Sequence, residues 1–316
     1  MTEHIRELLQ LINEDIEKMD LQMEPAELYQ PIRYILDLGG KRLRPLLALL
    51  SYGLYQSSPN DIVHIATGIE VFHNFTLMHD DIMDKAPLRR GKPSVHKKWT
   101  EEIGVLSGDV MLVKAYERFE QVPDDKILQV LKAFNTCAIE VCEGQQVDMN
   151  FEIQEEVSET SYLEMIRQKT AVLLGFSMEL GAILADAPEN HQNLLKEFGV
   201  NIGLGFQLKD DLLDVYGDQL KFGKQVGGDI ISNKKTYLLI KALDLVTGNL
   251  QTELKQWLSV AEFDKKEKVA AVTRIYNELG IRQYAAEKIN YYFKNAYQAL
   301  DQLEIHNHQL AELRAY

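Results

Sequence analysis

The sequence has 316 residues, of which 46% are hydrophobic, 26% are charged and only 8 are prolines. The net charge of −14 argues against a general nucleic-acid binder and against attraction to an anionic membrane surface. No run of about 18 apolar residues is present, so we expect no stable membrane insertion. Residues 1–20 are charged and amphipathic rather than leader-like, and Cys137 and Cys142 are the only cysteines, which favours a cytoplasmic protein.

Apolar residues recur every three or four positions along most of the chain, which is the spacing of one helix face. The pattern predicts helices over 2–19, 24–38, 42–56, 62–77, 104–120, 125–150, 159–185, 190–215, 234–247, 249–260, 263–278 and 281–303. No stretch reads convincingly as a strand, and no linker interrupts the pattern. We therefore expect an all-α fold, one large helical bundle with a central cavity, as a single domain over 1–316.

Two stretches interrupt the helical pattern, 84–94 and 216–235. Both contain glycine and several basic residues. Long connections without regular structure are uncommon in compact domains and are often functional lids. Each stretch follows directly after a cluster of acidic residues at the predicted end of a helix, which marks both places as parts of a site.

The two acidic clusters share the pattern D-D-x-x-D. The first contains Asp80, Asp81 and Asp84, and the second contains Asp210, Asp211 and Asp214. Acids four residues apart share a helix face and repel each other, and acids at a helix C-terminus oppose the helix dipole. A solvated helix end would explain one such cluster. Two copies, each followed by a basic stretch, favour hard oxygen ligands for Mg²⁺, whereas the spacing fits neither a di-iron bundle nor an EF-hand.

A series of motifs between about residues 35 and 240 resembles the trans-isoprenyl diphosphate synthases, also called polyprenyl synthetases. In order they are GGKRLRP at 39–45, HNFTLMHDDIMD at 73–84, RRG at 89–91, EGQ at 143–145, KT at 169–170, GFQLKDDLLD at 205–214, and 222–237 from FGK to KKTY. The ordered set is highly specific. One departure is Asn233, which stands where the family usually has glycine. The resemblance implies a helical bundle of the isoprenoid synthase type.

The resemblance implies a Mg²⁺-dependent prenyltransferase that joins isopentenyl diphosphate to dimethylallyl, geranyl or farnesyl diphosphate. About three Mg²⁺ ions would bridge the allylic diphosphate to the protein. The implied metal ligands are Asp80, Asp84 and Asp210, with Asp81, Asp211 and Asp214 completing the acidic catalytic set. The implied phosphate-binding cations are Arg89, Lys169, Lys224 and Lys234. Lys169, Thr170 and Gln207 would flank the allylic cation, and Phe206 and Gln145 would line the pocket, although ordinary helix packing also explains these two.

The second diphosphate, that of isopentenyl diphosphate, is implied to bind without metal at Gly40, Lys41, Arg44, His73 and Arg90. A basic helix start would also explain the run from Lys41 to Arg44, and a partner-bonded core position would also explain His73. Gly199 and Gly203 lie four residues apart on one predicted helix. We expect these two glycines to permit close helix packing rather than to take part in the chemistry.

The length of the product is expected to depend on the helix that precedes Asp80. Phe75 lies about 7.5 Å below Asp80 by helical rise, Phe72 lies almost one turn further, and Thr76 is small. A bulky residue at this position resembles the short-chain synthases, so Phe72, Phe75 and Thr76 are candidates for the floor of a pocket that holds farnesyl to geranylgeranyl chains. A longer-chain product and a plain core role for the two aromatic residues are the alternatives.

Three other functions share some of these features. A class I terpene cyclase or head-to-head synthase would not need the second basic site. An inactive partner subunit usually lacks one acidic motif, and both are intact here. A helical scaffold with acidic ends would bind no diphosphate. The family resemblance also implies a homodimer.

Overall fold

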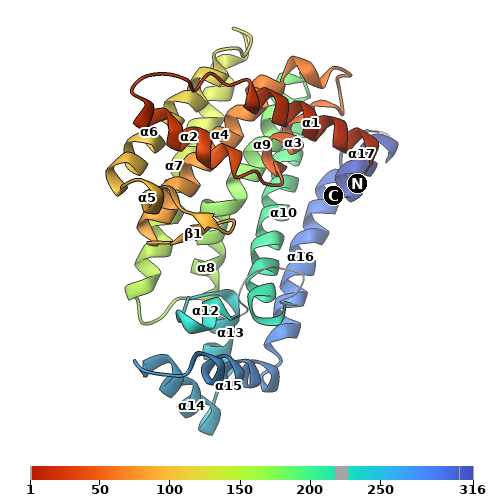
Figure 1. The fold of residues 1–316 in the computed structure, drawn as a ribbon. Helices are drawn as coiled ribbons and strands as arrows, with labels where there is room; N and C mark the ends of the chain where they lie inside the picture. The colour runs from red at the N-terminus through yellow and green to blue at the C-terminus, as the bar shows by residue number, and fades with distance from the viewer. Residues whose placement is uncertain (1, 218–226, 306, 316) are drawn as a thin grey trace. The chain divides into compact units, whose positions relative to one another are not determined.

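A computed structural model of the chain describes residues 2–217, 227–305 and 307–315. Lys224, predicted to contact the allylic diphosphate, lies outside the described residues, as do Phe222 and Gly223. Within the described ranges almost all of the regular secondary structure is helical (Figure 1). The all-α prediction is confirmed.

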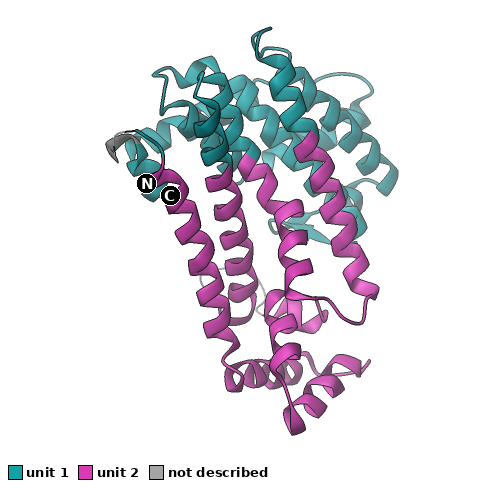
Figure 2. Cartoon of the chain, turned by 180° about the vertical axis from the view of Figure 1, so that it is seen from behind, with its two compact units in different colours: residues 1–135, 176–196, 303–316 teal, residues 136–175, 197–302 magenta. Residues whose placement is uncertain are grey.

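The chain divides into two compact units, which Figure 2 shows in different colours. Unit 1 comprises residues 1–135, 176–196 and 303–316, and unit 2 comprises residues 136–175 and 197–302. A single domain over 1–316 stays a prediction.

Unit 1 is built from helices at the N-terminus and one at the C-terminus. It contains α1 (Glu3–Glu17), α2 (Ala26–Asp37), α3 (Leu43–Tyr52), the short 3₁₀ helix η1 (Pro59–Asp61), α4 (Val63–Met83), α5 (Val95–Lys98), α6 (Glu101–Phe119) and α17 (Asn307–Ala315). Three further helices have residues in both units: α7 (Ile127–Ile153), α9 (Val172–Leu184) and α10 (Glu189–Tyr216).

Unit 2 completes those three helices and adds the rest of the chain. It contains α8 (Glu159–Ile166), the π-helical turn η2 (Arg167–Ala171), α12 (Gly228–Ile231), α13 (Tyr237–Leu245), α14 (Gly248–Ser259), α15 (Lys265–Glu278) and α16 (Ile281–Asp301). The side-chain hydroxyl of Ser158 accepts a hydrogen bond from the Ser161 amide and so caps α8. Asp264 caps α15 in the same way through the amides of Lys266 and Glu267.

Helix α4 is the centre of unit 1, and it packs against α1, α2, α3, α5 and α6. Gly68 allows α6 to approach, because a Cβ atom here would lie only 2.9 Å from the Cβ of Arg118. One turn further, the ring of Phe72 lies 5.1 Å from that of Phe134, within a buried aromatic cluster that also holds Phe119. This packing fixes the helix that ends at the first acidic motif.

In unit 2, two glycines set the packing of helix α10. A Cβ atom on Gly199 would lie 2.5 Å from the carbonyl oxygen of Leu174, and one on Gly203 would lie 2.6 Å from the Cα of Ala171. The prediction that these glycines permit close packing is confirmed. On α16, the ring of Phe293 lies against Gly205 of α10.

The prediction that the chain holds no strand is wrong at one place. β1 (Leu88–Arg89) and β2 (Lys92–Pro93) pair antiparallel in a short hairpin of unit 1. Its two-residue turn consists of Arg90 and Gly91, with φ of 52° and 76°. Two successive positive φ values match a type I′ turn, the turn best suited to a tight hairpin. Strands of two residues are too short to show alternation in the sequence.

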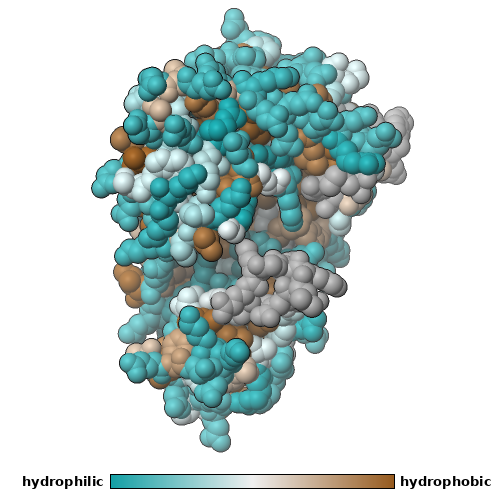
Figure 3. All heavy atoms as spheres, in the orientation of Figure 1, coloured by the Kyte–Doolittle hydropathy of each residue, from teal (hydrophilic) through white to brown (hydrophobic). Residues whose placement is uncertain are grey.

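The surface is polar over most of the face drawn in Figure 3, with hydrophobic side chains in small groups. Among the described helices, none combines the length and the apolar character needed to cross a membrane. The exposed hydrophobic residues include Val105, Leu106, Val113 and Tyr116, all on α6.

Candidate active site

The first acidic motif lies at the C-terminal end of α4, as predicted, with Asp84 as the C-cap residue. The middle acid, Asp81, is only 3% exposed. Its two carboxylate oxygens accept hydrogen bonds from Nε and Nη2 of Arg89 at 2.6 and 2.8 Å. Arg89 also lies 3.7 Å from an oxygen of Asp80. Asp81 therefore anchors the hairpin arginine, while Asp80 is partly exposed and Asp84 is exposed.

The hairpin directs its two arginines to different partners. Arg89 turns to Asp81, whereas Arg90 lies against the loop before α3. A Cβ atom on Gly40 would lie 2.7 Å from Nη2 of Arg90, and Gly40 has a φ of 143°. Glycine is therefore required at position 40 both by its backbone and by the guanidinium beside it. Two of the residues assigned to the second diphosphate, Gly40 and Arg90, therefore lie side by side, while their binding of that diphosphate stays a prediction.

Beneath this basic loop lies a buried ion pair that the sequence motifs did not reveal. Arg42 donates from Nη1 to Glu70 at 2.8 Å and from Nη2 to the carbonyl oxygen of Leu36 at 2.7 Å. Glu70 is 2% exposed and also accepts a hydrogen bond from Asn74. Because the guanidinium of Arg42 is engaged in these contacts, Arg42 holds the loop in place. Lys41, by contrast, is exposed.

His73 lies on α4 within an arginine-rich environment. Burial, followed by the positive charges of Arg44, Arg90, Arg89 and Arg42, holds the pKa of His73 well below its ordinary value. A protonated imidazole is therefore disfavoured, and the ring is neutral near pH 7. These cations come from the α3 start and the hairpin, so unit 1 gathers Arg44, His73 and Arg90 at one place, as expected for an anion site.

The three floor candidates lie on the same helix. Phe72 is 1% exposed and Phe75 is 9% exposed, and their ring centroids are 5.6 Å apart. The Phe75 ring also packs edge-on against His79 at 4.8 Å. The Thr76 hydroxyl donates to the carbonyl oxygen of His73 at 2.8 Å. Their place at the floor of a substrate pocket stays a prediction.

The second acidic motif lies near the C-terminal end of α10, again as predicted. Its middle acid, Asp211, is 5% exposed and accepts hydrogen bonds from the hydroxyl of Tyr162 and from Nε2 of Gln207, the latter at 3.2 Å. Burial raises the pKa of Asp211 to about 6, although these two donors act to lower it. Asp210 is exposed. The backbone amide of Asp229 donates to Asp214 at 3.0 Å.

A π-helical turn positions the predicted Lys169 and Thr170. Such turns are rare and are frequent at functional sites. Gly144 of α7 lies against it, because a Cβ atom there would be 2.3 Å from the backbone nitrogen of Lys169. The Lys169 ammonium donates to Asp148 at 2.7 Å, and the Thr170 hydroxyl donates to Oε1 of Gln207 at 3.4 Å. Unit 2 thus brings Lys169, Thr170 and Gln207 together.

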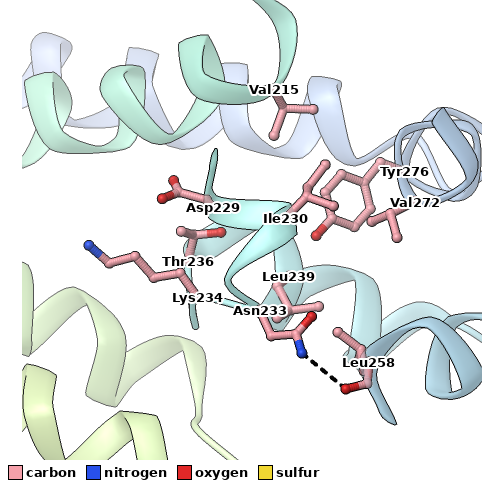
Figure 4. Close-up of a pocket in the computed structure, with 10 residues that line it drawn as sticks. All are labelled: Val215, Asp229, Ile230, Asn233, Lys234, Thr236, Leu239, Leu258, Val272 and Tyr276. Carbon is pink, nitrogen blue, oxygen red and sulfur yellow. Dashed lines mark hydrogen bonds between the residues drawn. The ribbon is translucent and has the colours of Figure 1, made fainter. Parts of the chain in front are cut away.

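The segment before α13 holds Lys234 near the same acids. Loss of hydration acts to lower the pKa of Lys234. The negative charges of Asp148 and Asp229 have the larger combined effect, so the pKa of Lys234 is raised above its ordinary value. Asn233, which departs from the family pattern, has a φ of 55°, a left-handed conformation that asparagine tolerates. Its side chain donates to the carbonyl oxygen of Leu258 at 3.0 Å (Figure 4). The left-handed conformation at position 233 is one that glycine and asparagine both adopt, so Asn233 fits this backbone.

A small pocket opens beside this segment. Figure 4 shows polar side chains of Asp229, Asn233 and Lys234 around it, with Tyr276 among the apolar lining. Its volume is about 10 Å³. That volume holds a single water molecule rather than a diphosphate.

The remaining predicted pocket residues have packing contacts. The Phe206 ring centroid lies 5.9 Å from that of Phe293, and Gln145 is partly buried. Both observations agree with the packing alternative for these two residues.

In the described part of the chain, no group of three or more His, Cys, Asp or Glu side chains is arranged to hold a metal ion. The implied metal ligands divide between the units, with Asp80 and Asp84 in unit 1 and Asp210 in unit 2. Their convergence on shared ions stays a prediction. Mg²⁺ commonly completes its coordination with water and substrate phosphates, so a set of one or two carboxylates is sufficient on each side.

Three residues with clear structural roles at the site were missed by the motifs: Glu70, Asp148 and Tyr162. Each is a partner of a predicted residue or of its neighbour, yet each comes from a different helix. A buried basic residue requires an acidic partner, so a predicted buried cation signals that such a partner exists. Spacing along the chain does not say which acid it is.

Comparisons with known proteins show the family of this chain. The family model described as "Polyprenyl synthetase" matches residues 25–278. The chain belongs to the polyprenyl synthetase family. Within the family, it is 37% identical over 306 residues to geranylgeranyl pyrophosphate synthase of Geoglobus acetivorans, covering 96% of this chain and 93% of that relative. It is 42% identical over 240 residues to a short chain isoprenyl diphosphate synthase of Methanocaldococcus jannaschii, covering 75% and 72%.

Solved structures of the family have the same fold. The crystal structure of geranylgeranyl pyrophosphate synthetase from Pyrococcus horikoshii matches with a TM-score of 0.91 and 34% identity, covering 99% of this chain and 95% of that one. A second geranylgeranyl pyrophosphate synthase structure matches with a TM-score of 0.91 and 44% identity, covering 97% and 96%. This polyprenyl synthetase is therefore a prenyltransferase with the all-α isoprenoid synthase fold.

Proposed function

We propose that this polyprenyl synthetase condenses isopentenyl diphosphate with an allylic diphosphate (dimethylallyl, geranyl or farnesyl) to give a trans product of farnesyl to geranylgeranyl length. The observation that carries the proposal is the pairing of a D-D-x-x-D motif with an arginine–histidine anion site in one unit. Similar proteins support this product class, since they include geranylgeranyl and farnesyl diphosphate synthases.

The reaction would depend on Mg²⁺, with about three ions between the allylic diphosphate and the acids. The donor set fits such ions. Carboxylate oxygens are the hard ligands that Mg²⁺ prefers, and Asp84 and Asp210 are exposed while Asp80 is partly so. The metal ligands would be these three residues. When bound, the ions would neutralise the charge that grows on the departing diphosphate.

The cations of this chain would assist the same bond cleavage. Arg89, Lys169 and Lys234 would donate charge-assisted hydrogen bonds to the phosphate oxygens, with Lys224 as a further candidate. Gln207 and Thr170 would turn their oxygen dipoles toward the allylic cation. The double bond of isopentenyl diphosphate would then attack the cation, and the released diphosphate would accept the proton that leaves. No described side chain is assigned the role of base.

The diphosphate of isopentenyl diphosphate would bind at Lys41, Arg44 and Arg90 together with His73. The low pKa of His73 keeps the imidazole neutral, so the ring offers one donor and one acceptor instead of a fourth positive charge. Gly40 keeps the loop close to Arg90, which sets the width of the site. Glu70 would limit the mutual repulsion of these cations in the absence of ligand.

The active form would be a homodimer. Helix α6 carries four exposed hydrophobic residues, Val105, Leu106, Val113 and Tyr116. At about 100° per residue, they fall within an arc of about 100° on one side of the helix. A contiguous apolar stripe of this kind is unusual on a monomer and suits contact with a second copy.

The decisive experiment incubates the protein with Mg²⁺, isopentenyl diphosphate and each allylic starter in turn, followed by measurement of released diphosphate and product sizing. We expect release that requires both isopentenyl diphosphate and Mg²⁺, and products of 15 or 20 carbons, about three or four isoprene units. Release without isopentenyl diphosphate would point to a terpene cyclase instead. Products that grow well beyond 20 carbons would point to a longer-chain synthase.

A further inference from the structure

Gln207 is predicted to face the allylic cation through its side-chain oxygen, and an amide can be turned either way. The amide ends in a carbonyl oxygen and an NH2 group of nearly the same size. Its orientation must therefore be set by the hydrogen-bond partners around it. In unit 2 the nitrogen end donates to Asp211 at 3.2 Å, and the oxygen end accepts from the Thr170 hydroxyl at 3.4 Å. The orientation of Gln207 therefore depends on Asp211 being an acceptor.

Asp211 is in turn held by Tyr162 of α8. The Tyr162 hydroxyl donates to Oδ2 of Asp211, while Oδ1 is the oxygen that accepts from Gln207. The backbone amide of Tyr237 lies 3.5 Å from the same Oδ2. Tyr162 is 2% exposed and Asp211 is 5% exposed, so no bulk water competes for these bonds.

We infer that Tyr162 is a positioning residue for prenyl transfer, acting through Asp211 to fix the amide of Gln207 with its oxygen toward the substrate. The effect on prenyl transfer rests on the proposed function, whereas the positioning of Gln207 rests on the hydrogen bonds described above. Tyr162 touches no substrate itself. Its hydroxyl donates to Oδ2 and so holds the Asp211 carboxylate in the orientation that presents Oδ1 to the amide nitrogen of Gln207.

The test compares Tyr162→Phe with Tyr276→Phe. Tyr276 is equally buried, at 2%, in the same hydrophobic core, and within the described part of the chain its hydroxyl makes no hydrogen bond to Asp211. Losing the Tyr162 hydroxyl should lower kcat about tenfold, while KM for both substrates and the half-saturating Mg²⁺ concentration change less than twofold. Tyr276→Phe should leave kcat unchanged. An unchanged kcat in Tyr162→Phe overturns the inference.

A double-variant cycle tests whether the effect passes through Gln207. In a Gln207→Ala background, Tyr162→Phe should lower kcat by less than a further twofold, because there is no longer an amide to orient. A full tenfold loss in that background would show that Tyr162 acts by another route. Should Tyr162→Phe not fold, the side-chain amide signals of Gln207 in the wild type decide, because exchange with water as fast as that of an exposed glutamine overturns the inference.

A spectroscopic measurement separates this inference from the proposed function. The side-chain amide signals of Gln207, assigned by their loss in Gln207→Ala, should shift and exchange faster with water in Tyr162→Phe but not in Tyr276→Phe. If the wild type fails with every substrate pair yet this shift is seen, the proposed function falls and the positioning stands. If the signals are identical in all three proteins, the positioning falls whatever the activity.

Discussion

Asp81 and Asp211 occupy the same place in the two acidic motifs, and each is buried by partners within its own unit. Asp81 binds Arg89 through both oxygens, so Asp81→Asn removes a charged, paired acceptor. Hydrogen bonds to charged groups contribute about 1.5–3 kcal/mol, so we expect the free energy of unfolding to fall by about 2 kcal/mol. Urea unfolding without Mg²⁺ or substrate measures this change.

Asp80→Asn is the matched control for that experiment. Asp80 lies 3.7 Å from Arg89, and its side chain is 22% exposed, so the free energy of unfolding should change by less than about 0.5 kcal/mol. Its turnover should instead fall at least about a hundredfold, because a metal ligand is lost. If Asp80→Asn destabilised the protein more than Asp81→Asn, the assignment of anchor and ligand would be reversed.

His73 makes the stability depend on pH. Its pKa in the folded protein is depressed, whereas in the unfolded chain it is near 6.5. Below pH 6.5 His73 binds a proton in the unfolded chain but not in the folded protein. The free energy of unfolding therefore falls as the pH falls. Between pH 7.5 and 5.5 the contribution is up to about 1.4 kcal/mol.

The measurement is urea unfolding of the wild type and His73→Asn at both pH values. Asparagine does not titrate, so the variant should lose less stability than the wild type over this interval. Other histidines contribute equally to both proteins and cancel in the difference. Parallel losses in the two proteins would mean that His73 titrates normally in the folded state.

Phe75 offers a test of product length. If its ring forms the floor, Phe75→Ala should extend the main product by one or more isoprene units, because a ring that packs on Phe72 and His79 is removed. Thin-layer analysis of the dephosphorylated products measures the length. Phe134→Leu, a change in the same aromatic cluster but off α4, is the control and should leave the length unchanged. An unchanged product in Phe75→Ala would exclude Phe75 as the floor.

At the scale of elements, the π-helical turn η2 depends on Gly144. Gly144→Ala would place a Cβ atom 2.3 Å from the backbone nitrogen of Lys169, so either α7 or the turn must move. Forcing an atom into a packed interior typically costs about 1–3 kcal/mol. We expect that loss in urea unfolding, together with a fall in kcat of about tenfold or more as Lys169 is displaced.

Gly53→Ala is the control for that variant. Gly53 has a negative φ of −62°, and its added Cβ would lie 3.3 Å from the carbonyl oxygen of Leu49, a distance that a small shift relieves. Its stability and activity should stay near wild type. If Gly144→Ala and Gly53→Ala had the same stability and the same kcat, α7 could move away from η2 without loss of either.

The elements themselves were predicted well where periodicity decides them. The range 190–215 was predicted for a helix found at Glu189–Tyr216, and 263–278 for one found at Lys265–Glu278. The stripe over 159–185 was also correct in extent, but its π-helical turn was invisible because one extra residue in a turn barely changes an apolar pattern. The hairpin at 88–93 was missed because its strands hold two residues each.

At the scale of the whole molecule, the α6 stripe predicts the oligomeric state. Leu106→Glu combined with Val113→Glu should convert a dimer to single chains, because two charges would be buried at the contact. Sedimentation velocity measures the change. Val260→Glu, at another exposed hydrophobic residue, should leave the dimer intact. A wild type that sediments as a single chain would contradict the homodimer.

The site was predictable as a set of residue types and less so as a network. Short motifs made Asp80, Lys169 and Gln207 candidates, because charge and order along the chain are visible in a sequence. Their partners, among them Asp148 and Tyr162, come from other helices, and only the fold brings them close. Whether Asp210 meets Asp80 across the two units stays a prediction, to be tested by the Mg²⁺ and substrate experiment above.

The acids that hold Arg89 and Lys169 have one more consequence. A long cationic side chain loses about 2 kcal/mol of rotamer entropy when it is fixed. Asp81 and Asp148 fix these two side chains during folding, before any ligand arrives. An incoming diphosphate would therefore meet preorganised donors, and most of the ordering that weakens association elsewhere would already be complete.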